Sequence, residues 1–313
     1  MGIDLAGMAL PNPLMTASGC AANGQELHRF FDISRLGAFV TKTVMAAPRS
    51  GRGTPRMAET PSGMLNSIGL QGPGIEAFCA RDLPWLASVG ARVLVSVAGG
   101  SVDEFASVAA AVGSNPAAGV ACGIEVNISC PNVASRGQVF AIDPAASAAV
   151  VRAVRETVAP GIPVFAKLSP DVTDLVEVAA AVLDAGADGL TLINTTLGMA
   201  IDTERMRPHL AGVTGGLSGP AIRPIAVRAI WQVHGAMRGG RIRSAPIIGV
   251  GGVRTGADAL ELVAAGASAV QVGTATFNDP MAPVRVLDEL TELLARRGYA
   301  AFDEVVGAAQ PRP

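Results

Sequence analysis

The sequence predicts an α/β protein, a (β/α)8 TIM barrel with a long covering insertion after its second strand. Short apolar, β-branched runs alternate with stretches of helical periodicity, a pattern typical of parallel sheets. Eight such runs occur within 313 residues, a length that α/β barrels commonly reach as one unit. Most runs are followed directly by Gly, Ser, Asn or Lys, as expected where the site lies at the carboxyl ends of barrel strands. We therefore expect one barrel domain spanning residues 1–313.

The strands are expected where apolar runs stop at polar or glycine residues. They fall at residues 13–17, 38–41, 92–98, 123–128, 163–167, 189–193, 246–250 and 268–272. Ala, Val and Leu at helical spacing predict helices between them. These fall near residues 26–32, 75–88, 144–158 and 172–185, from just after 220 to about 234, at 256–265, and from 280 onward as a C-terminal helix and tail. Residues 46–74 lack periodicity, which predicts a structureless insertion that covers a site.

An open, doubly wound sheet that binds a dinucleotide is the alternative architecture. Its only candidate fingerprint is the glycine-rich segment 249–254, where Arg254 occupies the position of the third glycine. The pattern therefore fails, and we expect no direct nicotinamide site on this chain.

Charge and hydropathy exclude several classes of partner. Lys and Arg number 24 against 26 Asp and Glu, a net charge of −2, so neither nucleic acid nor an anionic membrane surface is indicated. No apolar run reaches the roughly 18 residues of a membrane span. The first ten residues lack both a basic leader and an apolar signal core, so we expect a cytoplasmic protein.

The cysteines and histidines are too scattered to form a metal site. Cys20, Cys79, Cys122 and Cys130 include no Cys-x-x-Cys pair, and the three histidines show no ligand spacing. Iron–sulfur clusters and structural zinc need clustered thiolates, and a secreted disulfide framework needs a denser chain. We expect no metal on this chain.

The segment 125–132 places a thiol between two carboxamides directly after a predicted strand. In this position Cys130 could take a proton from a bound small molecule while Asn127 and Asn132 hold the polar edge of that molecule. The structural alternative is a buried cysteine beside asparagines that form a turn.

Other polar residues also follow the predicted strands and should meet at one end of the barrel. They are residues 17–19, Lys42, Lys167, Asn194, Thr195, Gly251, Gly252, Gly273 and Thr274. Two ammonium groups, amides and glycine-rich turns predict a pocket for an anion, and together with Ser218-Gly219 the turns indicate a phosphorylated cofactor. Lysines that snorkel at the barrel rim are the alternative for Lys42 and Lys167. Asn66 and Gly69 belong to the covering insertion, where plain turn chemistry is the alternative.

Five motifs together resemble one known family. They are the segments 127–132, 63–71, 164–170, 214–220 and 249–253. The combination resembles the dihydroorotate dehydrogenase family and, within it, the class 1B catalytic subunits, over residues 13 to about 279. One departure is Gly72, where the class 1B pattern usually has Asn.

The resemblance implies a role for each matching position. Cys130 matches the catalytic base. The positions that match substrate contacts are Lys42, Asn66, Gly69, Leu70, Asn127, Asn132, Asn194 and Thr195. The positions that match FMN contacts are Ala17, Ser18, Lys42, Asn127, Lys167, Ile193, Gly219, Gly251, Gly252, Gly273 and Thr274.

The resemblance also implies a flavoprotein oxidoreductase of pyrimidine biosynthesis that converts (S)-dihydroorotate to orotate. Cys130 would remove the C5 proton, hydride would pass from C6 to FMN, and Lys167 would favour the reduced flavin. The loop 131–138 would act as a lid. Electrons would reach NAD through a partner subunit that carries FAD and a [2Fe-2S] cluster, in a heterotetramer of two catalytic and two electron-transfer chains. A class 1A homodimer that uses fumarate and a non-redox phosphate-binding barrel are the alternatives.

Overall fold

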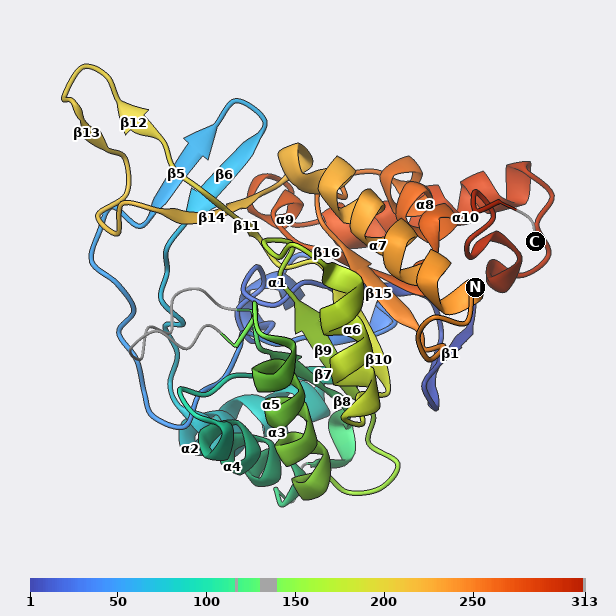
Figure 1. Cartoon of the computed structure of the whole chain (residues 1–313), viewed down its shortest axis with the longest axis horizontal. Helices are drawn as coiled ribbons and strands as arrows, with labels where there is room; N and C mark the ends of the chain where they lie inside the picture. Colours follow the sequence, from blue (N-terminus) through green and yellow to red (C-terminus); the bar gives the residue numbers. More distant parts are fainter. Residues whose placement is uncertain (116–117, 130–139, 312–313) are drawn as a thin grey trace.

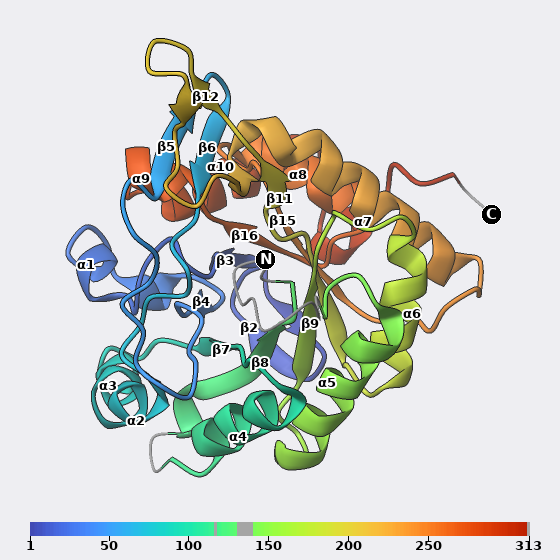
Figure 2. The ribbon, with the colours of Figure 1, turned by 60° about the vertical axis from the view of Figure 1, so that its left-hand side comes forward.

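Eight parallel strands form a barrel, in a computed structural model that describes residues 1–115, 118–129 and 140–311. The strands are β3 (Leu14–Thr16), β4 (Phe39–Val40), β7 (Val93–Val97), β8 (Ala121–Asn127), β9 (Val164–Leu168), β10 (Gly189–Leu192), β15 (Ile247–Val250) and β16 (Ala269–Val272). Their order around the sheet is β3-β16-β15-β10-β9-β8-β7-β4. Figure 2 shows helices packed outside this ring of strands. The predicted (β/α)8 fold and all eight predicted strands are confirmed.

The ring closes between β3 and β4 with the help of a side chain. A parallel bridge joins Met15 to Ala38. The backbone N–H of Val40 donates to Thr16 Oγ1 at 2.9 Å, and this hydroxyl donates to the Val40 carbonyl at 3.3 Å. Thr16 is completely buried, so its hydroxyl satisfies backbone groups that the two-residue strand β4 leaves outside the ladder.

The helices follow the strands nearly as predicted. They are α1 (Gln25–His28), α2 (Ile75–Ala77), α3 (Leu83–Ser88), α4 (Val102–Gly113), α5 (Pro144–Thr157), α6 (Leu175–Asp184), α7 (Arg223–Arg238), α8 (Gly256–Ala265), α9 (Ala275–Asn278) and α10 (Ala282–Arg296). The helix expected near 26–32 is shorter than predicted: α1 ends at His28, and a separate 3₁₀ turn at Ile33–Arg35 follows, capped by the side chain of Asp32. Within the part of the chain that the structure describes, no helix is long and apolar enough to cross a membrane.

Helix α4 is absent from the sequence prediction, although the sequence carries signals for it. Ser101 accepts a hydrogen bond from the backbone N–H of Glu104, a standard N-terminal cap. Phe105, Val108 and Val112 are buried along one face of the helix, at spacings of three and four residues. Small Ala and Val residues make up most of the helix, so its buried face is a weak signal in the sequence, and packing against the barrel stabilises the helix.

The covering insertion is partly ordered into strands, so the prediction of a structureless segment at 46–74 is wrong. Strands β5 (Met57–Thr60) and β6 (Gly63–Asn66) form a hairpin that joins β14 (Gly215–Ser218) and β11 (Thr196–Gly198) in a four-stranded antiparallel sheet. Their partners come from about 150 residues further along the chain, as in the pair Asn66–Gly216. Figure 1 shows this sheet at one end of the barrel, together with the hairpin of β12 (Ile201–Asp202) and β13 (Arg207–Pro208).

A third hairpin lies at the opposite end of the barrel (Figure 1). Strand β1 (Ile3–Leu5) pairs antiparallel with β2 (Met8–Leu10). The side chain of Met8 is buried, and a Cβ atom on Gly123 near the start of β8 would lie 3.1 Å from its sulfur. The hairpin therefore covers the amino ends of the strands and leaves the carboxyl ends for a site.

Candidate active site

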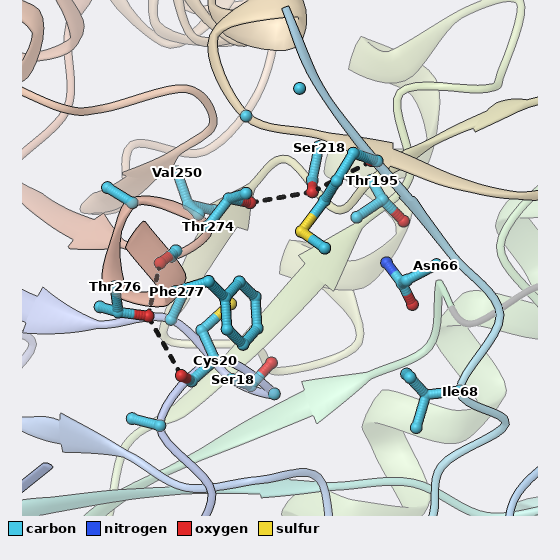
Figure 3. A pocket seen from close by; sticks show the side chains of 18 of the residues that line it. Ser18, Cys20, Asn66, Ile68, Thr195, Ser218, Val250, Thr274, Thr276 and Phe277 are labelled. Atoms are coloured by element: carbon cyan, nitrogen blue, oxygen red, sulfur yellow. Dashed lines mark hydrogen bonds between the residues drawn. The ribbon is translucent and has the colours of Figure 1, made fainter. Parts of the chain in front are cut away.

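A large cavity lies where the carboxyl ends of the barrel strands meet the antiparallel sheet. Its volume is about 1510 Å³, above the usual range of roughly 300–1,000 Å³ for a small-molecule pocket, so it has room for a cofactor and a substrate. Every predicted site residue other than Cys130 and Asn132 lines it. These two residues and the predicted lid at 131–138 lie outside the described residues. Figure 3 shows part of the lining.

Lys167 belongs to a buried polar cluster rather than to the rim. Its Nζ atom lies 3.4 Å from each of Glu125 Oε1, Gln271 Oε1 and Ser18 Oγ. Glu125 and Gln271 are completely buried, and Lys167 is 4% exposed. The rim alternative for Lys167 is therefore wrong, because a snorkelling lysine keeps its ammonium group in water.

Asn127 and Asn194 form a second buried network. Asn194 Nδ2 donates to Asn127 Oδ1 at 3.1 Å and to Ser129 Oγ at 2.6 Å. The Ser129 hydroxyl itself donates to Asn127 Oδ1 at 3.3 Å. The amides of Asn127, at the end of β8, and of Asn194, just after β10, thus lie in fixed orientations beside the cavity, and β9 lies between their two strands. Asn127 comes three residues before Cys130 in the chain.

Hydroxyl groups extend this network behind Asn127. Asn127 Nδ2 donates to Thr43 Oγ1 at 3.1 Å, and Thr43 is 3.0 Å from the Ser96 hydroxyl. Both hydroxyl residues are buried. They fix the amide orientation of Asn127, with its carbonyl oxygen facing Asn194 and Ser129.

The glycine turns at the ends of β14, β15 and β16 lie together on one wall. Gly219, Gly251 and Gly252 all have positive φ angles, of 86°, 141° and 73°. A Cβ atom on Gly252 would lie 2.7 Å from the Cβ atom of Arg223, so only glycine fits there. The Thr274 hydroxyl donates to Ser218 Oγ at 2.8 Å, which joins two of these turns (Figure 3).

The covering insertion brings Asn66, Gly69 and Leu70 over the cavity from the opposite side to the barrel. Asn66 Nδ2 donates to the Gly216 carbonyl at 3.3 Å across the antiparallel sheet. Gly69 and Leu70 have consecutive positive φ angles of 78° and 53°. Leucine at a positive φ is strained, and strain of this kind concentrates at functional sites.

Lys42 and Cys20 lie on the same side of the cavity. Lys42 follows β4, and a Cβ atom on Gly19 would lie 3.5 Å from its Nζ atom. Burial raises the pKa of the Cys20 thiol to about 11, although the charges of Lys167 and Lys42 act to lower it. Cys20 is therefore a neutral thiol at physiological pH and a poor base.

Sequence reasoning missed several side chains that hold the site together. Glu125, Gln271, Thr43 and Ser129 were not assigned roles, although Glu125 is an acidic residue inside an apolar strand and so needs a buried partner. Gln271 and Thr43 give no comparable signal, because their partners are distant in the sequence. Among the described residues, no group of His, Cys, Asp and Glu is arranged to hold a metal ion.

Comparison with known proteins agrees with this geometry. The family model described as dihydroorotate dehydrogenase matches residues 2–294. The chain is 49% identical over 310 residues to the protein named dihydroorotate dehydrogenase B (NAD(+)), catalytic subunit, of Geobacter sp. strain M21, covering 99% of this chain and 98% of that protein. It is 49% identical over 307 residues to the protein of the same name from Desulforudis audaxviator, covering 98% and 96%. The chain belongs to the dihydroorotate dehydrogenase family.

Proposed function

We propose that the protein oxidises (S)-dihydroorotate to orotate in pyrimidine biosynthesis, as the FMN-binding catalytic chain of a class 1B dihydroorotate dehydrogenase. One observation carries the proposal: the residues matched to substrate and FMN positions come from widely separated segments, yet all that the structure describes line one cavity. The relatives named above, which match along nearly their whole length, support the subclass. We also propose that residues 1–313 are one domain and that the enzyme works in the cytoplasm.

The amide network and Lys42 suit the polar edge of a planar carboxylate substrate. Asn127 and Asn194 offer fixed carboxamides, and Asn66 approaches from the covering sheet. Carboxamides both donate and accept, so they match the alternating N–H and C=O groups of a pyrimidine ring. The ammonium group of Lys42 would pair with the substrate carboxylate. Gly69, Leu70, Asn132 and Thr195 are assigned to the same subsite.

The wall formed by the glycine turns suits FMN. Glycines at positive φ let the backbone approach a phosphate closely, and Thr274 adds a hydroxyl beside them. A buried ammonium group, that of Lys167, faces the cavity beside Ser18. The FMN subsite would therefore comprise Ala17, Ser18, Lys42, Asn127, Lys167, Ile193, Gly219, Gly251, Gly252, Gly273 and Thr274.

Bound FMN would supply the acceptor for the hydride that leaves substrate C6. Cys130, which directly follows the Asn127–Ser129 network in the chain, would take the proton from C5. Asn127, Asn194 and Lys42 would hold the ring so that C5 faces the thiol. The loop 131–138 is proposed to exclude water during proton transfer.

The electrons would leave through a partner chain. This sequence has neither a cluster-binding cysteine motif nor a dinucleotide fingerprint. We propose that the partner carries FAD and a [2Fe-2S] cluster, passes electrons to NAD, and forms a heterotetramer of two catalytic and two electron-transfer chains. The mass of the complex after co-expression with such a partner tests the stoichiometry.

The visible spectrum of the purified chain, before and after anaerobic addition of dihydroorotate, tests the proposal. We expect flavin absorption that bleaches and does not recover on adding NAD, because the partner is missing. A colourless protein that fails to take up added FMN would contradict the redox function and favour a phosphate-binding barrel. Recovery with fumarate as fast as the bleaching would favour the class 1A homodimer.

A further inference from the structure

We propose that Glu125 and Gln271 are positioning residues for Lys167, and that the charge of Glu125 limits how strongly Lys167 favours reduced over oxidised FMN. The inference rests on the proposed function, since it requires FMN in the cavity. It concerns two residues that form no part of the cavity lining as the structure describes it.

The geometry places the three side chains in one interior cluster. Glu125 lies on β8, Lys167 on the adjacent β9, and Gln271 on β16. Gln271 Nε2 donates to Glu125 Oε2 at 2.8 Å, which leaves Glu125 Oε1 and Gln271 Oε1 to accept from Lys167 at 3.4 Å each. Glu125 and Gln271 are thus hydrogen-bonded to each other, and both contact the Lys167 ammonium group on the side away from the cavity.

Along the barrel axis, the Lys167 ammonium group lies nearer the cavity than the Glu125 carboxylate does. Asn127 pairs with Lys167 in the β8–β9 register, and Glu125 pairs with Phe165, two residues nearer the amino ends. Lys167 and Ser18 line the cavity, and Ser18 lies 3.4 Å from the Lys167 ammonium group. The ammonium group therefore lies between the carboxylate and the cavity, where it faces whatever the cavity holds.

Burial makes the charge of Glu125 matter to the ligand. Glu125 is completely buried and Lys167 is 4% exposed, so salt and water screen this pair weakly. A flavin gains negative charge on reduction, and a nearby cation favours the reduced form. A carboxylate directly behind that cation opposes part of its effect, because Coulomb interactions in a weakly screened interior persist beyond contact distance.

A purely structural ion pair is the competing explanation, and the two differ in what they predict. If Glu125 only stabilises the fold, its substitution lowers the melting temperature and leaves the preference of the site for reduced FMN unchanged. If Glu125 sets the charge that FMN experiences, this preference changes even in a well-folded variant. The decisive quantity is the ratio of the dissociation constants for oxidised and reduced FMN.

The experiment uses the full chain with FMN and three variants. Glu125→Gln removes the charge while keeping the size of the side chain. Glu125→Gln combined with Gln271→Glu moves the carboxylate to β16 and keeps one carboxylate and one carboxamide around Lys167. Thr191→Val is the packing control, because Thr191 pairs with Lys167 in the β9–β10 register and is completely buried, and its hydroxyl has no hydrogen-bond partner within the described residues.

The readouts are the dissociation constant for oxidised FMN and the midpoint potential from anaerobic titration against a reference dye. For Glu125→Gln we expect the ratio to rise about tenfold in favour of reduced FMN. We expect the double variant to lie within about threefold of the wild type and Thr191→Val within about twofold.

A folded Glu125→Gln variant with an unchanged or lower ratio would overturn the proposal. If that variant does not fold, a fourth variant, Gln271→Glu, decides, because it adds a second carboxylate beside Lys167. The proposal predicts that its ratio falls below that of the wild type, and an unchanged or higher ratio overturns the proposal. Failure of the wild-type chain to bind FMN at all would instead contradict the proposed function.

Discussion

Asn194 is the residue on which the amide network depends. Its Nδ2 group serves both Asn127 and Ser129, and its Oδ1 atom accepts from the backbone N–H of Thr195 at 2.8 Å. Three of its hydrogen-bonding positions are thus used within the protein. Asn194 therefore has little hydrogen-bonding capacity left for a substrate, so we infer that it contributes to substrate binding mainly by orienting Asn127.

Asn194→Ala should therefore weaken substrate binding more than it slows the chemical step. Losing a buried partner costs about 1–3 kcal/mol, which corresponds to a rise in KM for dihydroorotate of roughly 5- to 150-fold. Steady-state kinetics with the reconstituted enzyme measure the split between kcat and KM. Asn115→Ala is the control, because Asn115 donates to the Cys79 carbonyl away from the cavity. An equal rise of KM in both variants would contradict a positioning role for Asn194.

Cys130→Ser should bind FMN normally and reduce it very slowly with dihydroorotate at neutral pH. A serine hydroxyl is a far weaker base, and general base catalysis contributes on the order of 10²- to 10⁴-fold. Anaerobic stopped-flow bleaching measures the rate. The matched control is Cys122→Ser, because burial raises the pKa of the Cys122 thiol to about 11 and the residue is absent from the cavity lining. Near-wild-type bleaching by Cys130→Ser would exclude a thiol base at this position.

The wild-type bleaching rate should also rise with pH towards the ordinary thiol pKa of about 8.5, because only the thiolate accepts the proton. Cys20, which lines the cavity, has its pKa raised to about 11 by burial and stays protonated through this range. A rate that is flat between pH 6 and about 9 would contradict a cysteine base with an ordinary pKa.

At the scale of elements, the turn between β15 and α8 shows why glycine is needed beside the proposed phosphate site. Gly252 combines a φ angle of 73° with a neighbour, the Arg223 Cβ atom, that would lie 2.7 Å from an added Cβ. Gly240 has a similar φ of 67° but nothing within 4 Å. A substitution at Gly240 therefore tests backbone strain alone, whereas one at Gly252 tests backbone strain together with steric crowding.

Gly252→Ala should lower FMN affinity by tenfold or more, whereas Gly240→Ala should leave it unchanged. Both substitutions carry the strain of a positive φ, about 1 kcal/mol, and should lower the melting temperature slightly. Only Gly252→Ala also displaces Arg223 and the glycine wall of the cavity. Titration of the apoprotein with FMN gives the affinities. Equal losses in the two variants would show that the Gly252 turn has no specific part in binding.

For the molecule as a whole, the C-terminal tail is fastened to the barrel around His234. Gly307 donates its backbone N–H to the Val263 carbonyl at 2.9 Å, and Gln310 Nε2 donates to the carbonyls of Trp231 and Ala265 at 3.0 Å each. A Cβ atom on Gly307 would lie 2.5 Å from His234 Cε1, so ring and tail are in close contact. His234 Nδ1 has no hydrogen-bond partner within the described residues.

His234 should make the fold less stable in mild acid. Burial, together with the charge of Arg238, lowers the pKa of His234 below its ordinary value of 6.5. The unfolded chain therefore binds the proton first, so stability is full above about pH 6.5 and falls as the pH drops towards the folded-state pKa. His234→Gln should flatten the melting temperature between about pH 7 and 5, measured by scanning fluorimetry. A pH profile parallel to that of the wild type would contradict this assignment.

The sequence alone determined the barrel and most of the candidate site. The eight strands were predictable because each buried parallel strand is a short apolar run that can be recognised locally in the sequence. The ends of these strands bring Lys42, Asn127, Lys167 and the glycine turns together at one cavity. Cys130 and Asn132 stay predictions, since they lie outside the described residues.

Only the tertiary structure decided which residues support that site. Strands β5 and β6 were not predictable, because β6 is stabilised by pairing with β14, about 150 residues away in the sequence. Such distant antiparallel partners leave no local pattern. The ion pair of Glu125 with Lys167 and the link to Gln271 also depend on strands brought together by barrel closure. Local periodicity therefore specified the elements, while contacts between distant segments specified the charge and orientation of the groups that face the cavity.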